Sequence, residues 1–300
     1  MDVPLNSVSA TVEGKIDLCG FVGVGDVKVG MSDVSVGIKL DAPDASDEQL
    51  DALKGAVDAH CPLVATIANP LLLTTVVVKK APSASKDETG RGPSLKEGVM
   101  GVVAAATEDN ECLRMTYSST SKLAGAGLMS DVTLPGGHTM IVDEVRFLPG
   151  GVPTQLRNRL PLLAHLLSPF CQYLHSPSPS HHSTQPLTMP GGSNKGPNPL
   201  DLFCASFGTC QEITYKYYAD VLGIDCQSVS CKVVAPIDLG GLVGVDMSAV
   251  ALKQMTGTIT IESDASDAEI ATLKGAVDAH CPLVDTLKSA TPVALTWSRA

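Results

Sequence analysis

The chain has 300 residues, of which 44% are hydrophobic and 18% charged, so it can bury a core and is not a mostly disordered protein. A formal net charge of −11 and an aromatic content of 4% argue against nucleic acid or an anionic membrane as the main partner. We find no apolar run of the roughly 20 residues that a membrane span needs, and no secretory signal. We therefore expect the nine cysteines to be free or redox-active thiols in the cytoplasm, or in an organelle that keeps them reduced.

The chain contains an internal repeat. The twelve residues from Leu53 to Val64 recur unchanged from Leu273 to Val284, and weaker similarity extends the repeat to residues 1–80 and 222–300. The segment before Ser228 has no counterpart before Ser7. We therefore expect residues 1–80 to be a truncated half-domain that packs on a more complete second copy.

Each copy is predicted to contain strands and a capped helix. In the first copy, residues 7–15 and the alternating residues 27–40 are typical of strands, with a change of phase at Ser32 and Asp33. Capping boxes at Ser46 and Ser266 begin the two helices. Pro62 and Pro282 either end these helices or start second, short ones. Residues 74–79 and 292–298 are predicted to close the two copies as strands.

The region between the copies is heterogeneous. We predict an interdomain linker at 81–110, and then antiparallel strands at 113–119, 127–134 and 138–145 with a turn at Pro135. Residues 145–200 contain no Asp or Glu. We interpret 149–190 as a disordered insertion, although a translated intron would have the same composition. The His181–His182 pair lacks accompanying acidic or paired cysteine ligands, so we predict no metal site there.

A long helix follows, with clear signals at both ends. Asn198 is the predicted N-cap, Pro199 the first helical residue and Gly223 the residue after its last turn. Helical spacing places a set of small and apolar residues on or near one face: Leu202, Ala205, Ser206, Thr209, Ile213, Tyr217 and Val221. This face would suit an apolar substrate.

Two of the cysteines, and a third that repeats one of them, are candidates for thiol chemistry. Cys281 follows His280 and precedes Pro282, so it would be the N-cap of a last helix, where backbone amides favour the thiolate. Cys61 has the same local sequence. Cys210 lies in the middle of the long helix, where a cysteine is often only a small buried residue. The chain has no CxxC pair, which argues against thioredoxin-like and zinc-ribbon sites.

Two motifs resemble the OsmC/Ohr superfamily. Residues 192–203, followed by Gly208-Thr209-Cys210, are similar to its central-helix signature, and residues 280–283 to its second cysteine motif. The resemblance implies an α+β fold with antiparallel β-sheet wrapped around long central helices, and members of the family are typically intertwined dimers. Here it implies a domain at 111–300 and a homodimer or internal pseudo-dimer.

The resemblance also implies a function. Cys210 would be the peroxidatic thiol and Cys281 the resolving thiol of a stress-response peroxidase that reduces organic hydroperoxides, with a dithiol as reductant and without cofactor or metal. Leu200 stands where the peroxidase branch has a glutamate; Asp201 follows it, and Arg114 is a candidate for the arginine that holds the thiolate. The departure at Leu200 leaves a non-catalytic redox-sensing or small-molecule-binding module as an alternative. A Cys–His hydrolase is disfavoured, because consecutive helical side chains point about 100° apart.

Overall fold

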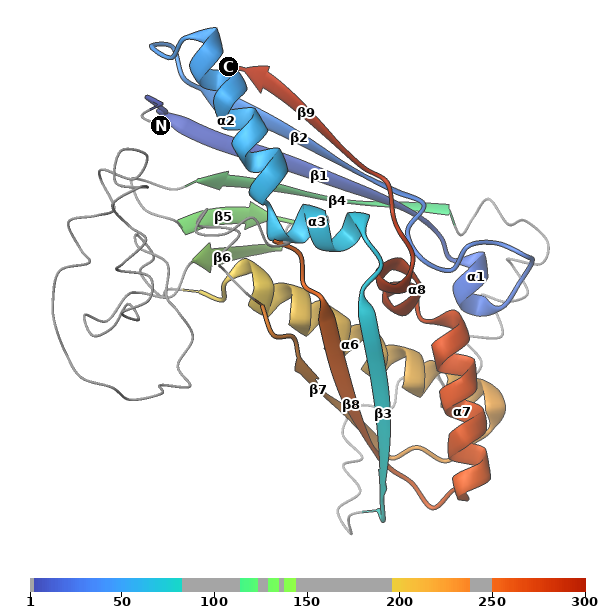
Figure 1. Ribbon diagram of the computed structural model, residues 1–300. Helices are drawn as coiled ribbons and strands as arrows, with labels where there is room; N and C mark the ends of the chain where they lie inside the picture. Colours follow the sequence, from blue (N-terminus) through green and yellow to red (C-terminus); the bar gives the residue numbers. More distant parts are fainter. Residues whose placement is uncertain (1–2, 83–113, 124–128, 135–137, 144–195, 238–249) are drawn as a thin grey trace, which may run out of the picture.

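The computed structural model describes residues 3–82, 114–123, 129–134, 138–143, 196–237 and 250–300. They form two sheets with helices on both (Figure 1). In chain order the elements are β1 (Ser7–Asp17), α1 (Cys19–Val22), β2 (Asp33–Asp41), α2 (Asp47–His60), α3 (Pro62–Ala68), β3 (Leu72–Lys80), β4 (Arg114–Leu123), β5 (Met129–Thr133), β6 (Thr139–Asp143), α6 (Pro199–Leu222), β7 (Ser228–Val234), β8 (Gln254–Glu262), α7 (Asp267–His280), α8 (Pro282–Lys288) and β9 (Val293–Arg299).

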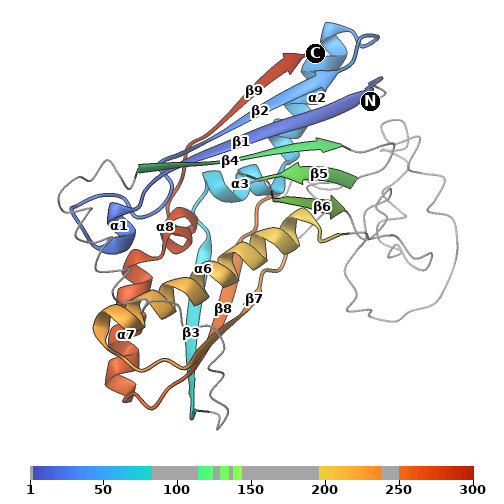
Figure 2. The ribbon, with the colours of Figure 1, turned by 180° about the vertical axis from the view of Figure 1, so that it is seen from behind.

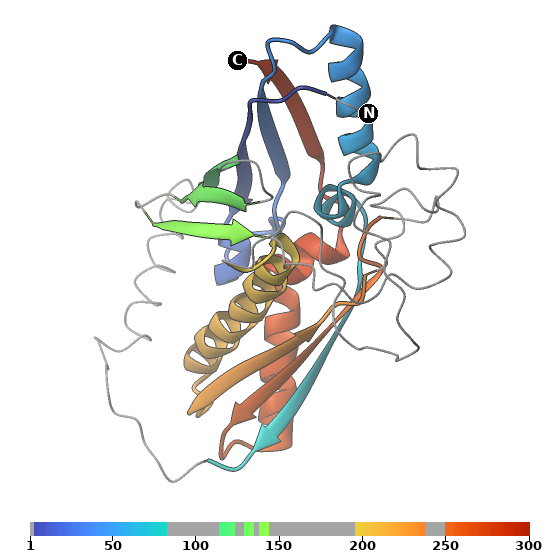
Figure 3. The same cartoon turned by 90° about the vertical axis from the view of Figure 1, so that its left-hand side faces the viewer.

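The fold is α+β, as predicted from the resemblance. One sheet has six strands in the order β6-β5-β4-β1-β2-β9, and the other has three in the order β3-β8-β7. Most neighbours are antiparallel, but β2 pairs with β9 and β3 with β8 in parallel. Helices α6 and α7 lie against the three-stranded sheet, while α2 packs on the six-stranded one (Figures 2 and 3).

The two parallel pairs exchange strands between the copies of the repeat. The last strand of the first copy, β3, joins β8 of the second, and the last strand of the second copy, β9, joins β2 of the first. Where the two copies cross, Leu71 N donates to Leu287 O, and the equivalent residue of the second copy, Thr291, donates through its N–H to Ile67 O. The two copies are therefore interleaved in both sheets. The predicted domain boundaries at 80 and 111 stay predictions.

Local sequence signals account for most of the elements. Ser46 and Ser266 form complete capping boxes with Gln49 and Glu269 at the starts of α2 and α7. Pro62 and Pro282 begin the short helices α3 and α8. The prediction of a strand from Val27 was wrong in its first half: β2 begins at Asp33. The residues before it form a loop whose Gly30 and Met31 amides donate to Asp285 and Thr286 on α8, so tertiary hydrogen bonds replace the strand.

Helix α6 has the predicted ends but buries a different face. Asn198 and Asp201 form a capping box, and Gly223 ends the helix with φ 70°. The face that we expected to be the important one is largely solvent-exposed, with Ile213 65% exposed. The buried face instead carries Phe207, Gly208, Gln211, Thr214, Tyr215, Tyr218 and Ala219, and Tyr217 is the one residue of the expected face that is buried with them. Because this face includes the polar residues Gln211 and Thr214, the spacing of apolar residues alone did not identify it as the buried face.

Several predictions fall outside the described residues. These are the linker at 81–110 except its first two positions, the turn at Pro135, the insertion at 149–190 with His181 and His182, and the cysteines Cys112 and Cys171. In the described part of the chain, no helix is long and apolar enough to cross a membrane.

Candidate thiol centre

The two predicted site cysteines meet in space. Cys210 lies near the middle of α6, and Cys281 occupies the junction between α7 and α8. Their Sγ atoms are 3.5 Å apart, although 70 residues separate them in the chain. A disulfide bond is about 2 Å long, so a small movement of either side chain would join them.

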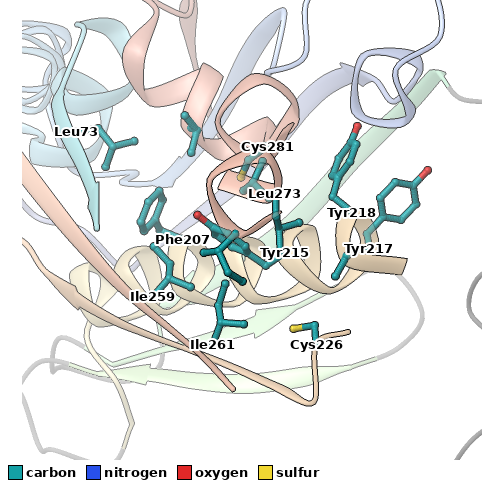
Figure 4. Close-up of a cluster of buried hydrophobic side chains, with 14 of the residues drawn as sticks. Leu73, Phe207, Tyr215, Tyr217, Tyr218, Cys226, Ile259, Ile261, Leu273 and Cys281 are labelled. Atoms are coloured by element: carbon teal, nitrogen blue, oxygen red, sulfur yellow. The ribbon is translucent and has the colours of Figure 1, made fainter. Parts of the chain in front are cut away.

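Close packing of three elements fixes this position. Phe207, one turn before Cys210, is fully buried against the three-stranded sheet, where a Cβ added to Gly257 would lie 3.0 Å from its ring. On the other side of α6, Leu273 and Val277 of α7 are fully buried in the same cluster. Helix α7 ends just before Cys281, so this packing also positions Cys281 (Figure 4). The backbone of α6 is thus held against β8 and α7, and the two sulfur atoms with it.

The two thiols differ in their access to solvent. Cys281 is only 1% exposed, whereas Cys210 is half-buried and lies beside the exposed face of α6. A reagent from solution would therefore reach Cys210 first.

The two thiols also differ in their ionisation. A hydrogen bond with Cys210 lowers the pKa of Cys281 to about 7, assisted by the backbone amides of Val284 and Leu283 and opposed by burial. The same hydrogen bond, together with burial, raises the pKa of Cys210. The two pKa shifts share one cause: the hydrogen bond places one proton between the two sulfur atoms and favours ionisation of Cys281 over that of Cys210.

Two further polar side chains of α6 belong to this centre, and the sequence analysis missed both. Gln211 is fully buried, and its Nε2 donates to Cys281 Sγ at 2.9 Å. Thr214 is also buried, and its hydroxyl donates to Cys210 O at 2.7 Å. Their signal in the sequence is their spacing: they lie one and four residues after Cys210, on the face that α6 buries.

The hydrogen bond of His280 is directed away from the thiol pair, although a histidine next to Cys281 in the sequence could have been expected to support its thiolate. Its Nδ1 lies 2.9 Å from Gly20 O, and its ring stacks on Tyr218 with centroids 5.2 Å apart. The hydroxyl of Tyr218 in turn donates to Phe21 O. His280 therefore fastens α1 to α7 and α6, and Cys281 receives its hydrogen bonds from elsewhere.

The remaining sequence candidates occupy other places. Asp201 accepts from Asn198 N at 3.2 Å as part of the helix cap, and Leu200 packs against the core. Arg114 is the first residue of β4, opposite Asp17 in the strand register, but its side chain lies outside the description. Cys61 is the N-cap of α3, as Cys281 is the N-cap of α8. Among the described residues, no cluster of His, Cys, Asp and Glu could hold a metal ion.

Comparison with known proteins supports the resemblance. Residues 192–296 match the family model described as OsmC-like protein, so the chain carries an OsmC-like domain that includes both Cys210 and Cys281. The match covers less than half of the chain. No curated protein matches the sequence.

Two solved structures match parts of this one. An OsmC-like protein from Mycoplasma pneumoniae is 15% identical, with a TM-score of 0.36 over 61% of this chain and 96% of that one. The organic hydroperoxide resistance protein OhrB of Bacillus subtilis is also 15% identical, with a TM-score of 0.30 over 61% of this chain and 98% of that one.

Proposed function

We propose that the protein is a thiol peroxidase that reduces organic hydroperoxides through Cys210 and Cys281. The single observation that carries this proposal is the 3.5 Å separation of the two sulfur atoms inside an OsmC-like domain. The difference in exposure supports Cys210 as the peroxidatic thiol and Cys281 as the resolving thiol.

The first step uses the proton that the pair shares. When the proton lies on Cys281, the Cys210 thiolate attacks the terminal oxygen of the hydroperoxide, and the O–O bond breaks. Cys210 becomes a sulfenic acid, and the leaving alkoxide takes a proton from Cys281 and departs as the alcohol. Cys281 is left as a thiolate next to the oxidised sulfur.

In the second step the Cys281 thiolate attacks Cys210 Sγ and displaces hydroxide, which takes a proton from solvent and becomes water. One hydroperoxide and two thiols have then given one disulfide, one alcohol and one water. A dithiol from solution returns the pair to the reduced state by thiol–disulfide exchange.

The surface beside Cys210 supports an organic rather than an inorganic hydroperoxide. Ile213 is three residues away, so it lies next to Cys210 on the helix surface, and its side chain is 65% exposed. An apolar group bound there would be partly removed from water, a contribution that hydrogen peroxide lacks.

The test is to count free thiols after reduced protein is mixed with one equivalent of cumene hydroperoxide. We expect loss of two thiols in the wild type and no disulfide in Cys210→Ser or Cys281→Ser. Cys61→Ser is the matched control, since it alters the same His-Cys-Pro-Leu sequence in the other copy and should react as the wild type does. If the wild type keeps both thiols, the proposal fails.

The alternative is a redox-sensing or binding module without turnover, and the observation in its favour is that Asp201 is held in the helix cap. Such a protein would form the disulfide but would not consume hydroperoxide repeatedly. Sustained consumption with dihydrolipoamide present as the dithiol would exclude it.

A further inference from the structure

Gln211 combines two features that are costly in a protein core. Its side chain is 0% exposed, and its Oε1 has no hydrogen-bond partner within the described part of the chain. Leaving a buried amide oxygen unpaired costs free energy, which an apolar residue of the same shape would avoid. We therefore expect the NH₂ group of the same side chain to have a role that offsets this cost.

The NH₂ group of Gln211 points at the sulfur atom of Cys281. Nε2 lies 2.9 Å from Cys281 Sγ, and an amide N–H is only a donor, so the sulfur has to accept. A neutral thiol is a weak acceptor, whereas a thiolate accepts strongly, and hydrogen bonds to charged groups are about twice as strong as neutral ones. The contact is most favourable when Cys281 is ionised.

We propose that Gln211 is a catalytic hydrogen-bond donor that stabilises the thiolate of Cys281. This inference rests on the proposed two-cysteine function, and it adds a third side chain to the centre. It explains how Cys281 can hold a charge at a position that is 1% exposed, where water cannot solvate it.

The donor would act from the moment Cys281 loses its proton; before that, it opposes the shift of the proton to Cys281 that ionises Cys210. In the first step, Cys281 gives its proton to the leaving alkoxide, and the amide stabilises the charge that remains. In the second step, the same thiolate attacks the sulfenic acid, so the fraction of Cys281 that is ionised sets the rate of disulfide formation at a given pH.

The first test uses the wild-type protein alone. The side-chain amide resonances of Gln211 in ¹⁵N NMR should shift between pH 5 and 10 with the titration of Cys281, and this shift should be absent in Cys281→Ser. Amide resonances that do not move over this range in the wild type would overturn the inference without any change to the core.

The second test removes the donor and keeps the shape. Gln211→Met should raise the pKa of Cys281, measured from thiolate absorbance near 240 nm against Cys281→Ser, by about one to two units. At pH 7 conversion of the Cys210 sulfenic acid to the disulfide should slow by about tenfold, and the rate of this step should recover as the pH is raised past the new pKa. A merely structural role would not produce this recovery.

The control is Tyr215→Phe, one turn along the same face. Tyr215 is also fully buried, and its hydroxyl lacks a partner among the described residues, so Tyr215→Phe likewise removes a polar group from the buried face of α6. If Gln211→Met, or Gln211→Leu should the first variant not fold, keeps the pH profile of this control, the inference is wrong. A wild type that keeps both thiols would instead refute the peroxidase proposal.

Discussion

The proton shared by Cys210 and Cys281 makes the folded state sensitive to pH. Folding lowers the pKa of Cys281 to about 7 and raises that of Cys210, while both thiols of the unfolded chain titrate near their ordinary value of about 8.5. The two shifts therefore act in different pH ranges and in opposite directions.

We predict that the free energy of unfolding rises between about pH 7 and 8.5 and falls at higher pH. In the first range only the unfolded state keeps the Cys281 proton, so raising the pH favours the folded state. Above it only the folded state keeps the Cys210 proton, so the sign reverses. Urea unfolding of reduced protein at each pH measures this.

In Cys281→Ser the rise attributable to this thiol, on the order of 2 kcal/mol, should disappear. Cys61→Ser should retain it. A rise of the same size in Cys281→Ser would show that another group causes it.

At this scale the sequence drew attention to two cysteines that the fold brings together, but not to their neighbours. Motifs pointed to Cys210 and Cys281, and the N-cap position of Cys281 is confirmed. Gln211 and Thr214 could not be singled out, because their role depends on which face of α6 is buried, and tertiary packing decides that.

At the scale of elements, α2 and α7 share most of their sequence but not their surroundings. In α7 the residues Ile270, Leu273 and Val277 are all buried, whereas in α2 only Leu50 is. The long helix α6 packs against α7, and among the described residues no helix of that length packs against α2. The same sequence thus has two different energetic roles.

We predict that Leu273→Ala costs much more stability than Leu53→Ala, although the two residues lie in identical stretches. Leu273 is 0% exposed, and truncating a fully buried leucine costs about 2–5 kcal/mol. Leu53 is only half-buried, so we expect a loss of about 1 kcal/mol or less. Urea midpoints of the two variants measure the difference; equal losses would contradict the burial described here.

Most elements were predictable because their signals are local. Capping boxes, prolines at the first helical position and period-two alternation act within a few residues of the chain. The prediction at residues 27–32 failed for the opposite reason: that segment is held by Asp285 and Thr286, which lie more than 250 residues away.

At the scale of the whole molecule, strand exchange binds the two copies together. Strands β2 and β9 pair from Val34–Val293 to Leu40–Arg299, β3 and β8 from Leu72–Gln254 to Lys80–Glu262, and β1 pairs with β4 from Ser9–Lys122 to Asp17–Arg114. Each of these contacts joins residues before 81 to residues after 113. The two parts of the chain are therefore joined along both sheets.

We predict that the chain stays assembled when it is cut between the copies. With a protease site inserted near residue 95, the two fragments should elute together in size-exclusion chromatography and separate only in denaturant. The uncut protein with the same insertion is the control. Fragments that separate in native buffer would contradict the interleaved arrangement.

The repeat was visible in the sequence, but the exchange was not. Aligning the copies predicts that β3 and β9 are equivalent strands. They would be equivalent whether each paired with a strand of its own copy or with a strand of the other copy. Which sheet each strand enters depends on the path of the chain after α3 and α8, where Leu71 and Thr291 bond across to the other copy.

The placement of β9 makes the core near α2 depend on residues at the other end of the sequence. Trp297 packs into the small core formed by Leu40, Ala42, Ala45 and Leu50, and Arg299 donates to the carbonyls of Ala42 and Ala45. Loss of residues 293–299 would therefore remove the edge strand of the six-stranded sheet and expose β2, which lies more than 250 residues earlier in the chain. The thiol pair would lose no residue of its own, and the damage would fall on the small core around α2 instead.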